Sequence, residues 1–151
     1  MNYLKLKDFG NLMIVLAFDI STKRTGWAVG DLDYVIEESG SFKSNSFVES
    51  YTNFNSLITK WKPVLVICPK PTNRYNVIRA LSEMTGVLRL ICEKKEIDLY
   101  RNLVDSSCKK VVLGNGRASK KEIMNHYGLA DEDEADARMM WDYYKITNNE
   151  K

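Results

Sequence analysis

The sequence has few of the residues on which several common catalytic sites depend. It contains one histidine, His126, and three cysteines at irregular spacing. One histidine leaves little material for a histidine-rich zinc site or a Ser-His-Asp triad, and His126 itself is interpreted as an incidental surface residue. An odd number of irregularly spaced cysteines does not form a disulfide framework and fits a reducing compartment. We therefore expect a cytoplasmic protein.

Long apolar segments are also missing. No apolar run reaches the roughly 18 residues that a membrane-spanning helix needs, and the N-terminal residues lack the apolar core of a signal peptide. The length of 151 residues, 44% of them hydrophobic, is typical of one globular domain. We expect residues 1–12 to form an N-terminal extension and residues 13–151 to form that domain.

Charge is unevenly distributed along the chain, although the net charge is only +2. From Lys60 to Lys121 there are 14 lysines and arginines against five acidic residues. Residues 122–151 have the opposite balance, with three positive and eight negative side chains. This separation suggests that one part of the protein holds a polyanion and another part acts on it. The alternative is that the basic residues are only solvated surface groups.

An apolar run that ends in a carboxylate stands near the start of the expected domain. Val15 to Phe18 are all apolar and predict a buried central strand, and Asp19 follows them directly. A polar turn then leads to Thr25-Gly26. Asp19 has two interpretations: a turn cap at a strand end, or a metal ligand whose charge a cation compensates.

The remaining pattern predicts an α/β protein. Short apolar runs predict strands at 13–19, 26–30, 34–42, 64–68 and 97–100. Helical spacing and capping residues predict helices at 48–60, 73–95, 105–112, 119–127 and 130–145. This order indicates a mixed central sheet, made of a three-stranded meander plus crossover strands and flanked by helices.

A second group of carboxylates opens the last predicted helix. The stretch 131–136 contains five acids in six residues, among them Asp133 and Asp136. Residues three apart share one face of a helix. A favourable interaction with the helix dipole is the simpler explanation for acids in a first turn. The functional interpretation is that Asp19, Asp133 and Asp136 converge on Mg²⁺ or Mn²⁺, which prefer oxygen ligands and support two-metal phosphodiester cleavage.

A basic stretch separates the two groups of acids. It carries Gly114 and Gly116 in a predicted loop, and its cations are Lys109, Lys110, Arg117, Lys120 and Lys121. Glycines allow a close approach of backbone to phosphate, and a helix starting at Ser119 offers free N–H groups to an anion. A plain surface turn is the alternative.

Together these three stretches resemble RuvC, a family of Holliday junction resolvases with an RNase H-like fold. The resemblance rests on Asp19 with Thr25-Gly26, on Lys109 and Lys120 at the family's separation, and on Asp133 with Asp136-Ala137. It implies a homodimeric endonuclease that nicks four-way and other branched DNA with Mg²⁺ or Mn²⁺. The short spacing between the basic loop and the last acids hints at a phage-type relative, acting in a bacterial or phage-infected cell.

The resemblance also implies a role for each matched position. Asp19, Asp133 and Asp136 would be catalytic metal ligands, and Lys109 would be catalytic. DNA would be held by Lys110, Arg117, Lys120, Lys121, Arg74 and Tyr75. Helix 73–95 would lie at the dimer interface, although its apolar stripe fits an intrachain core equally well.

One departure from the family is serious. RuvC-like enzymes have a catalytic Glu at the end of the strand equivalent to 64–67, where this chain has Cys68. Natural divergence, an engineered change and compensation by Glu134 are all compatible with this. The alternative function is a branched-DNA binding protein with impaired or lost cleavage. A sugar-kinase or heat-shock type ATPase is a weaker alternative, because that fold needs two such domains.

Overall fold

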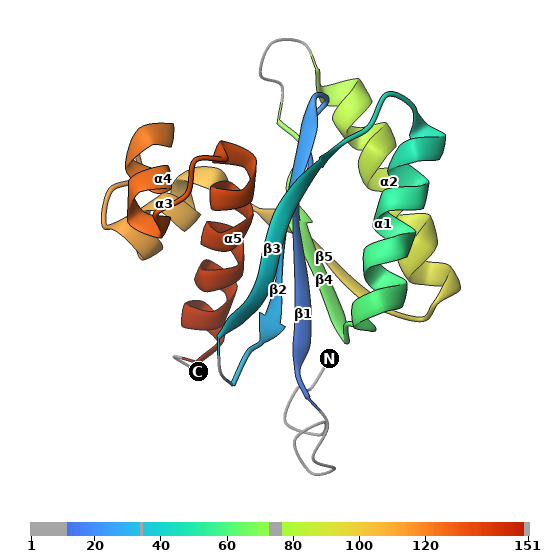
Figure 1. The fold of residues 1–151 in the computed structure, drawn as a ribbon, viewed down its shortest axis with the longest axis horizontal. Helices are drawn as coiled ribbons and strands as arrows, with labels where there is room; N and C mark the ends of the chain where they lie inside the picture. Colours follow the sequence, from blue (N-terminus) through green and yellow to red (C-terminus); the bar gives the residue numbers. More distant parts are fainter. Residues whose placement is uncertain (1–11, 34, 73–76, 150–151) are drawn as a thin grey trace.

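The structure, a computed structural model, describes residues 12–33, 35–72 and 77–149. Five strands form one sheet in the order β3-β2-β1-β4-β5, with helices on both faces (Figure 1). The predicted mixed α/β architecture is therefore confirmed. The expected extension, except Leu12, and two residues predicted to bind DNA, Arg74 and Tyr75, lie outside the described residues. None of the helices in the described ranges is long and apolar enough to cross a membrane.

The N-terminal part of the sheet is the predicted meander. β1 (Ile14–Asp19), β2 (Arg24–Asp31) and β3 (Ile36–Lys43) pair antiparallel. At the end of β1, Asp19 lies opposite Gly26 of β2. The two residues of the sequence motif, Asp19 and Gly26, thus form a cross-strand pair at the end of the central strand.

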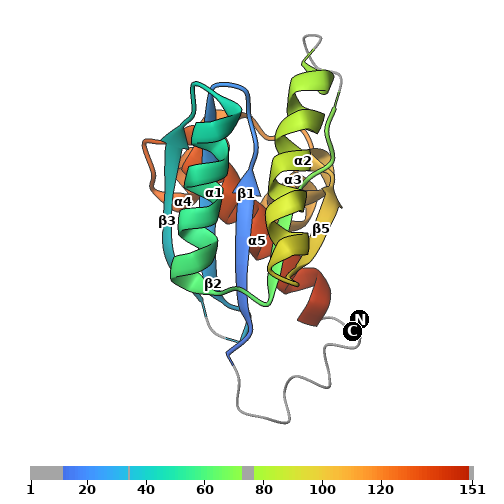
Figure 2. The same cartoon turned by 90° about the vertical axis from the view of Figure 1, so that its right-hand side faces the viewer.

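The other two strands are parallel to β1. Helix α1 (Phe47–Trp61) leads to β4 (Leu65–Pro69), and helix α2 (Ile78–Lys94) leads to β5 (Asp98–Leu103). Both helices cover the same face of the sheet (Figure 2). Within the described residues, α2 begins at Ile78, later than the predicted start at Asn73.

Three C-terminal helices cover the opposite face (Figure 1). They are α3 (Asp105–Leu113), α4 (Lys120–Tyr127) and α5 (Glu132–Asn149). The predicted capping box is present in α4, with Ser119 and Glu122 bonding each other's backbone N–H groups. The buried Trp141 of α5 donates its indole N–H to the Val15 carbonyl at 3.1 Å, which fixes α5 on the central strand.

Side-chain alternation along β1 divides the core into two layers. Val15 and Ala17 pack in the layer beneath α3, α4 and α5, whereas Leu16 and Phe18 pack in the layer beneath α1 and α2. Successive residues of a strand point to opposite faces, so β1 is buried on both. The same alternation directs Asp19 toward the α5 face, because it stands two residues after Ala17.

Candidate active site

A pocket opens where the carboxyl ends of three parallel strands meet. Strands β1, β4 and β5 run in the same direction, so their last residues lie along one edge of the sheet. Helices α2, α3, α4 and α5 complete the pocket wall. Its ionisable lining residues are the carboxylates Asp19, Asp105 and Asp136 and the cations Lys70, Lys109 and Lys120. Two acids predicted from distant parts of the sequence, Asp19 and Asp136, therefore share this pocket.

Asp19 supplies a carboxylate without a protein partner. Among the described residues it forms no hydrogen bond or ion pair. Burial raises the pKa of this carboxyl well above its usual range, and the charges of Asp136, Asp133 and Asp105 raise it further. A desolvated carboxylate of this kind is unfavourable unless a cation compensates it. This favours the cation-binding interpretation of Asp19 over a turn cap.

Asp136 lies on the pocket side of α5, and its carboxylate also forms no ion pair or hydrogen bond within the described part of the chain. Burial raises the pKa of Asp136 to about 6, with Asp105 as the next cause, while Lys120 and Lys109 oppose the shift. Lys120 also opposes the shift of Asp19. The two carboxylates thus repel each other and share a nearby lysine. Their proximity joins the first strand to the last helix.

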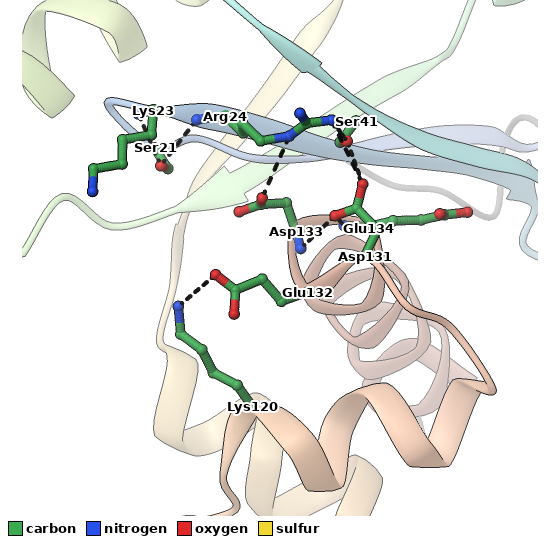
Figure 3. A network of polar contacts seen from close by, with 9 residues as sticks. All are labelled: Ser21, Lys23, Arg24, Ser41, Lys120, Asp131, Glu132, Asp133 and Glu134. Atoms are coloured by element: carbon green, nitrogen blue, oxygen red, sulfur yellow. Dashed lines mark hydrogen bonds and ion pairs between the residues drawn. The ribbon is translucent and has the colours of Figure 1, made fainter.

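Asp133 is placed differently from Asp136, although one helical turn separates them. It does not line the pocket, and its Oδ2 lies 3.9 Å from Nε of Arg24 on β2 (Figure 3). Its charge still reaches the pocket, because it contributes to the raised pKa of Asp19. The predicted triad of aspartates is therefore gathered in one region, with Asp133 held at its margin by an ion pair.

A polar network fixes the start of α5 against the meander. Asp131 accepts backbone N–H groups of Asp133 at 2.9 Å and Glu134 at 3.2 Å. Ser41 donates its hydroxyl to Asp131 and accepts a hydrogen bond of 2.7 Å from Nη2 of Arg24 (Figure 3). Burial alone would raise the pKa of Asp131, but these hydrogen bonds and Arg24 outweigh it and lower the pKa. This network positions the helix that carries Asp136.

Glu134 does not supply the missing acid in this structure. Its carboxylate accepts the Ser39 hydroxyl of β3 at 2.6 Å, and it does not line the pocket. β3 is the edge strand farthest from β4 in this half of the sheet. Glu134 therefore faces the meander and not the strand on which the family's Glu is expected.

Cys68 is also turned away from the pocket, contrary to its assignment to the site. Its side chain is fully buried in the core layer beneath α1 and α2, where burial raises the pKa of its thiol to about 12. Pro69, the next residue, lines the pocket instead. Cys68 and Pro69 face opposite sides of the sheet, because one step along a strand exchanges the two faces.

The basic residues divide into two sets. Lys109 and Lys120 line the pocket, where Nζ of Lys109 lies 2.7 Å from Asp105 and Nζ of Lys120 lies 3.0 Å from Glu132. Lys110, Arg117 and Lys121 are exposed on α3, the following loop and α4, outside the pocket. The pocket thus has cations at its wall and further cations on the adjacent surface.

Asp105 was missed as a site residue, because it entered the prediction only as the first residue of the helix at 105–112. One signal could have identified it: Asp105 closely follows a strand, and parallel strands end at a common edge. The pocket carboxylates are oxygen donors, which suit Mg²⁺ or Mn²⁺. Within the described residues, however, no group of three or more acidic, cysteine or histidine side chains is already arranged to hold a metal ion. The unpaired Asp19 fits a cation, but the carboxylates do not form a closed cage.

Comparison with known proteins connects this architecture to solved structures. No protein-family model and no curated protein sequence matches the chain. Thermus thermophilus RuvC superposes with a TM-score of 0.70 at 12% sequence identity, over 90% of this chain and 97% of that one. T. thermophilus RuvC in complex with a Holliday junction substrate gives 0.65 at 10% identity, over 89% and 96% of the two chains.

A eukaryotic protein shows the same arrangement more distantly. The yeast mitochondrial Holliday junction resolvase Ydc2 superposes with a TM-score of 0.50 at 12% identity, over 89% of this chain and 82% of that one. Identities this low establish the fold alone. The chain therefore has the RNase H-like fold in the form seen in RuvC.

Proposed function

We propose that this protein is a divalent-metal-dependent endonuclease that binds four-way and other branched DNA as a homodimer and nicks its phosphodiester bonds. The observation that carries the proposal is the pocket itself. Two unpaired carboxylates, Asp19 and Asp136, meet there beside Lys109 and Lys120 on the fold of a Holliday junction resolvase. In this proposal the protein is a phage-type relative that processes recombining DNA in a bacterial or phage-infected cell.

The pocket residues have separate roles in this proposal. Asp19 and Asp136 would hold Mg²⁺ or Mn²⁺, and Asp133 would join them once its ion pair with Arg24 opens. The bound ions would supply Lewis acidity and an activated water for hydrolysis. Lys109 and Lys120 would neutralise the scissile phosphate as it enters between them. Their ion pairs with Asp105 and Glu132 keep both ammonium groups at the pocket wall before DNA arrives.

DNA would extend from the pocket over the neighbouring basic surface. Lys110, Arg117 and Lys121 are exposed there and would bind phosphates. Arg74 and Tyr75, beyond the described residues, are still predicted to bind DNA. T. thermophilus RuvC has been solved with a Holliday junction, which supports the same substrate class for this chain.

The homodimer would use the outer surface of α2. Its predicted apolar stripe is largely occupied within the chain, because Met84, Leu88 and Ile91 are buried in the core. Leu90 remains 54% exposed and Ile78 42% exposed on the same helix. Sedimentation velocity measures the oligomeric state directly, and Leu90→Lys should shift a dimer toward monomer.

Binding and nicking of synthetic DNA test the proposal. The protein should bind a four-way junction more tightly than a linear duplex of equal length, and should nick it only with Mg²⁺ or Mn²⁺. Asp19→Asn and Asp136→Asn should abolish nicking while leaving junction binding intact. The matched control is Asp98→Asn, an exposed aspartate at the other end of β5. Equal affinity for both DNAs, or full nicking by either pocket variant, would refute the proposal.

A branched-DNA binding protein with weak or absent cleavage is the second candidate. The observation that favours it is Pro69, which occupies the pocket-facing end of β4 without a carboxylate. Selective junction binding without nicking in either metal would establish this candidate.

A further inference from the structure

Strand β4 contributes no carboxylate to the pocket. Acids reach the pocket from β1 and α5, but β4 contributes only Pro69 at its pocket-facing end. The preceding thiol, Cys68, is buried on the opposite face. If the pocket holds metal ions as proposed, a carboxylate must reach this end of β4 from another element.

The neighbouring strand brings such a carboxylate to the end of β4. Pro69 of β4 is paired with Leu103 of β5, and the Lys70 N–H donates to the Leu103 carbonyl at 2.8 Å. Asp105 follows Leu103 by two residues and begins α3. It therefore stands at the carboxyl end of the strand adjacent to β4, along the same edge of the sheet.

Asp105 also lies in the same pocket as the two unpaired carboxylates. It lines the pocket together with Asp19 and Asp136. The three carboxylates therefore come from three different elements and line one pocket. Asp19 and Asp136 have no protein partner in the described ranges that would satisfy them without a cation.

We infer that Asp105 is a metal-ligand residue of this pocket and supplies from α3 the carboxylate that β4 lacks. This inference rests on the proposed metal-dependent function and deepens it. It assigns a site residue that neither the sequence motifs nor the resemblance pointed to. A hard divalent cation such as Mg²⁺ or Mn²⁺ would then be bound by oxygens from β1, α3 and α5.

The ion pair between Asp105 and Lys109 is the competing explanation. Nζ of Lys109 lies 2.7 Å from Oδ2 of Asp105, at a spacing of four residues in α3. Asp105 could serve only to orient Lys109 toward DNA. The two explanations differ in metal affinity without DNA, because orienting a lysine does not bind a cation. If Asp105 is a ligand, Lys109→Met frees its carboxylate and leaves Mn²⁺ affinity unchanged or higher.

Mn²⁺ titration of the full chain without DNA, followed by the EPR signal of the free ion, tests the inference. Asp105→Asn should raise the Mn²⁺ dissociation constant about tenfold or more, and Asp105→Glu should retain most of the affinity. Asp98→Asn is the matched charge control, because Asp98 is exposed at the other end of β5 and does not line the pocket. An equal loss in Asp98→Asn would show a general field effect and overturn the inference.

A relocation experiment gives a second measure. Pro69→Glu in the Asp105→Asn background places a carboxylate on β4 and should recover Mn²⁺ affinity. If Asp105→Asn binds Mn²⁺ like the parent while Asp19→Asn does not, Asp105 is not a ligand but the proposed function stands. If Asp19→Asn also binds like the parent, the metal site of the proposed function fails as well. Circular dichroism of each variant confirms that it is folded.

Discussion

Gly26 lies against the backbone of Asp133, with no room for a side chain between them. A Cβ built on Gly26 would stand 1.8 Å from the carbonyl oxygen of Asp133 and 2.3 Å from its carbonyl carbon. Gly26 is also the cross-strand partner of Asp19. The glycine therefore lets the start of α5 approach the strand pair that carries Asp19, which brings the first and last acids of the site together.

Gly26→Ala should strongly destabilise the protein, because the neighbour that must move is backbone and not a flexible side chain. We expect a loss of about 3 kcal/mol or more in the free energy of unfolding, at or above the upper end for overpacked sites. Gly86→Ala is the matched control. Gly86 lies in α2 with open space around its Cβ position, so alanine should stabilise by about 0.5–1 kcal/mol. Urea denaturation of both variants measures the difference, and similar stabilities would contradict the close approach.

Without metal, the protein should become more stable as the pH falls from 7.5 to 5. The pKa of Asp136 is raised from 3.8 to about 6, so in this range the folded state binds more protons than the unfolded state. Stability then decreases as pH rises through the raised pKa, by at most about 3 kcal/mol for this group. Thermal unfolding in EDTA measures the effect, and Asp136→Asn should reduce it. Higher stability at pH 7.5 than at pH 5 would contradict the desolvated cluster.

Cys68→Glu should unfold the protein more easily and should not restore a ligand. The side chain at position 68 lies in the core beneath α1 and α2, where an unpaired carboxylate costs about 3 kcal/mol or more. Cys68→Val keeps an apolar side chain of similar size and should cost about 1 kcal/mol or less. Chemical denaturation compares the two variants. A stable Cys68→Glu protein with increased nicking would show that position 68 faces the pocket after all.

Removal of exposed cations next to the pocket should weaken DNA binding and its dependence on salt. Lys110→Ala, Arg117→Ala and Lys121→Ala should each lower junction affinity. Each should also reduce the slope of log affinity against log salt by about 0.9 for every phosphate that the variant no longer neutralises. Lys60→Ala is the control, since Lys60 lies in α1 on the opposite face, paired with Glu38. Fluorescence anisotropy at several salt concentrations measures both quantities. An unchanged slope would remove that residue from the DNA surface.

Much of the fold could be predicted because its signals are local. The burial of β1 follows from an unbroken apolar run, and the start of α4 follows from the spacing of Ser119 and Glu122. Likewise, the pattern of residues 131–136 predicted that Asp133 and Asp136 lie in the first turns of one helix, and both do. The position of Asp19 at a strand end was predicted from such a pattern, and the structure has Asp19 and Asp136 in one pocket.

The finer composition of the pocket could not be predicted in this way. Which of Cys68 and Pro69 faces the acids depends on the pleat of β4, and a shift of one residue reverses the outcome. Asp133 lies at the margin of the pocket, where it forms an ion pair with Arg24. Arg24 is distant from Asp133 in the sequence and comes close to it only in the folded protein.

The sequence alone determined the order of the elements and the mixed sheet, because periodicity and capping act over a few residues. It also identified the acids and cations that could form a site. The tertiary structure decided which of them share a pocket. Asp105 reaches it because β5 lies beside β4 and ends at the same edge, and strand neighbours are set by long-range packing that no short stretch of sequence encodes.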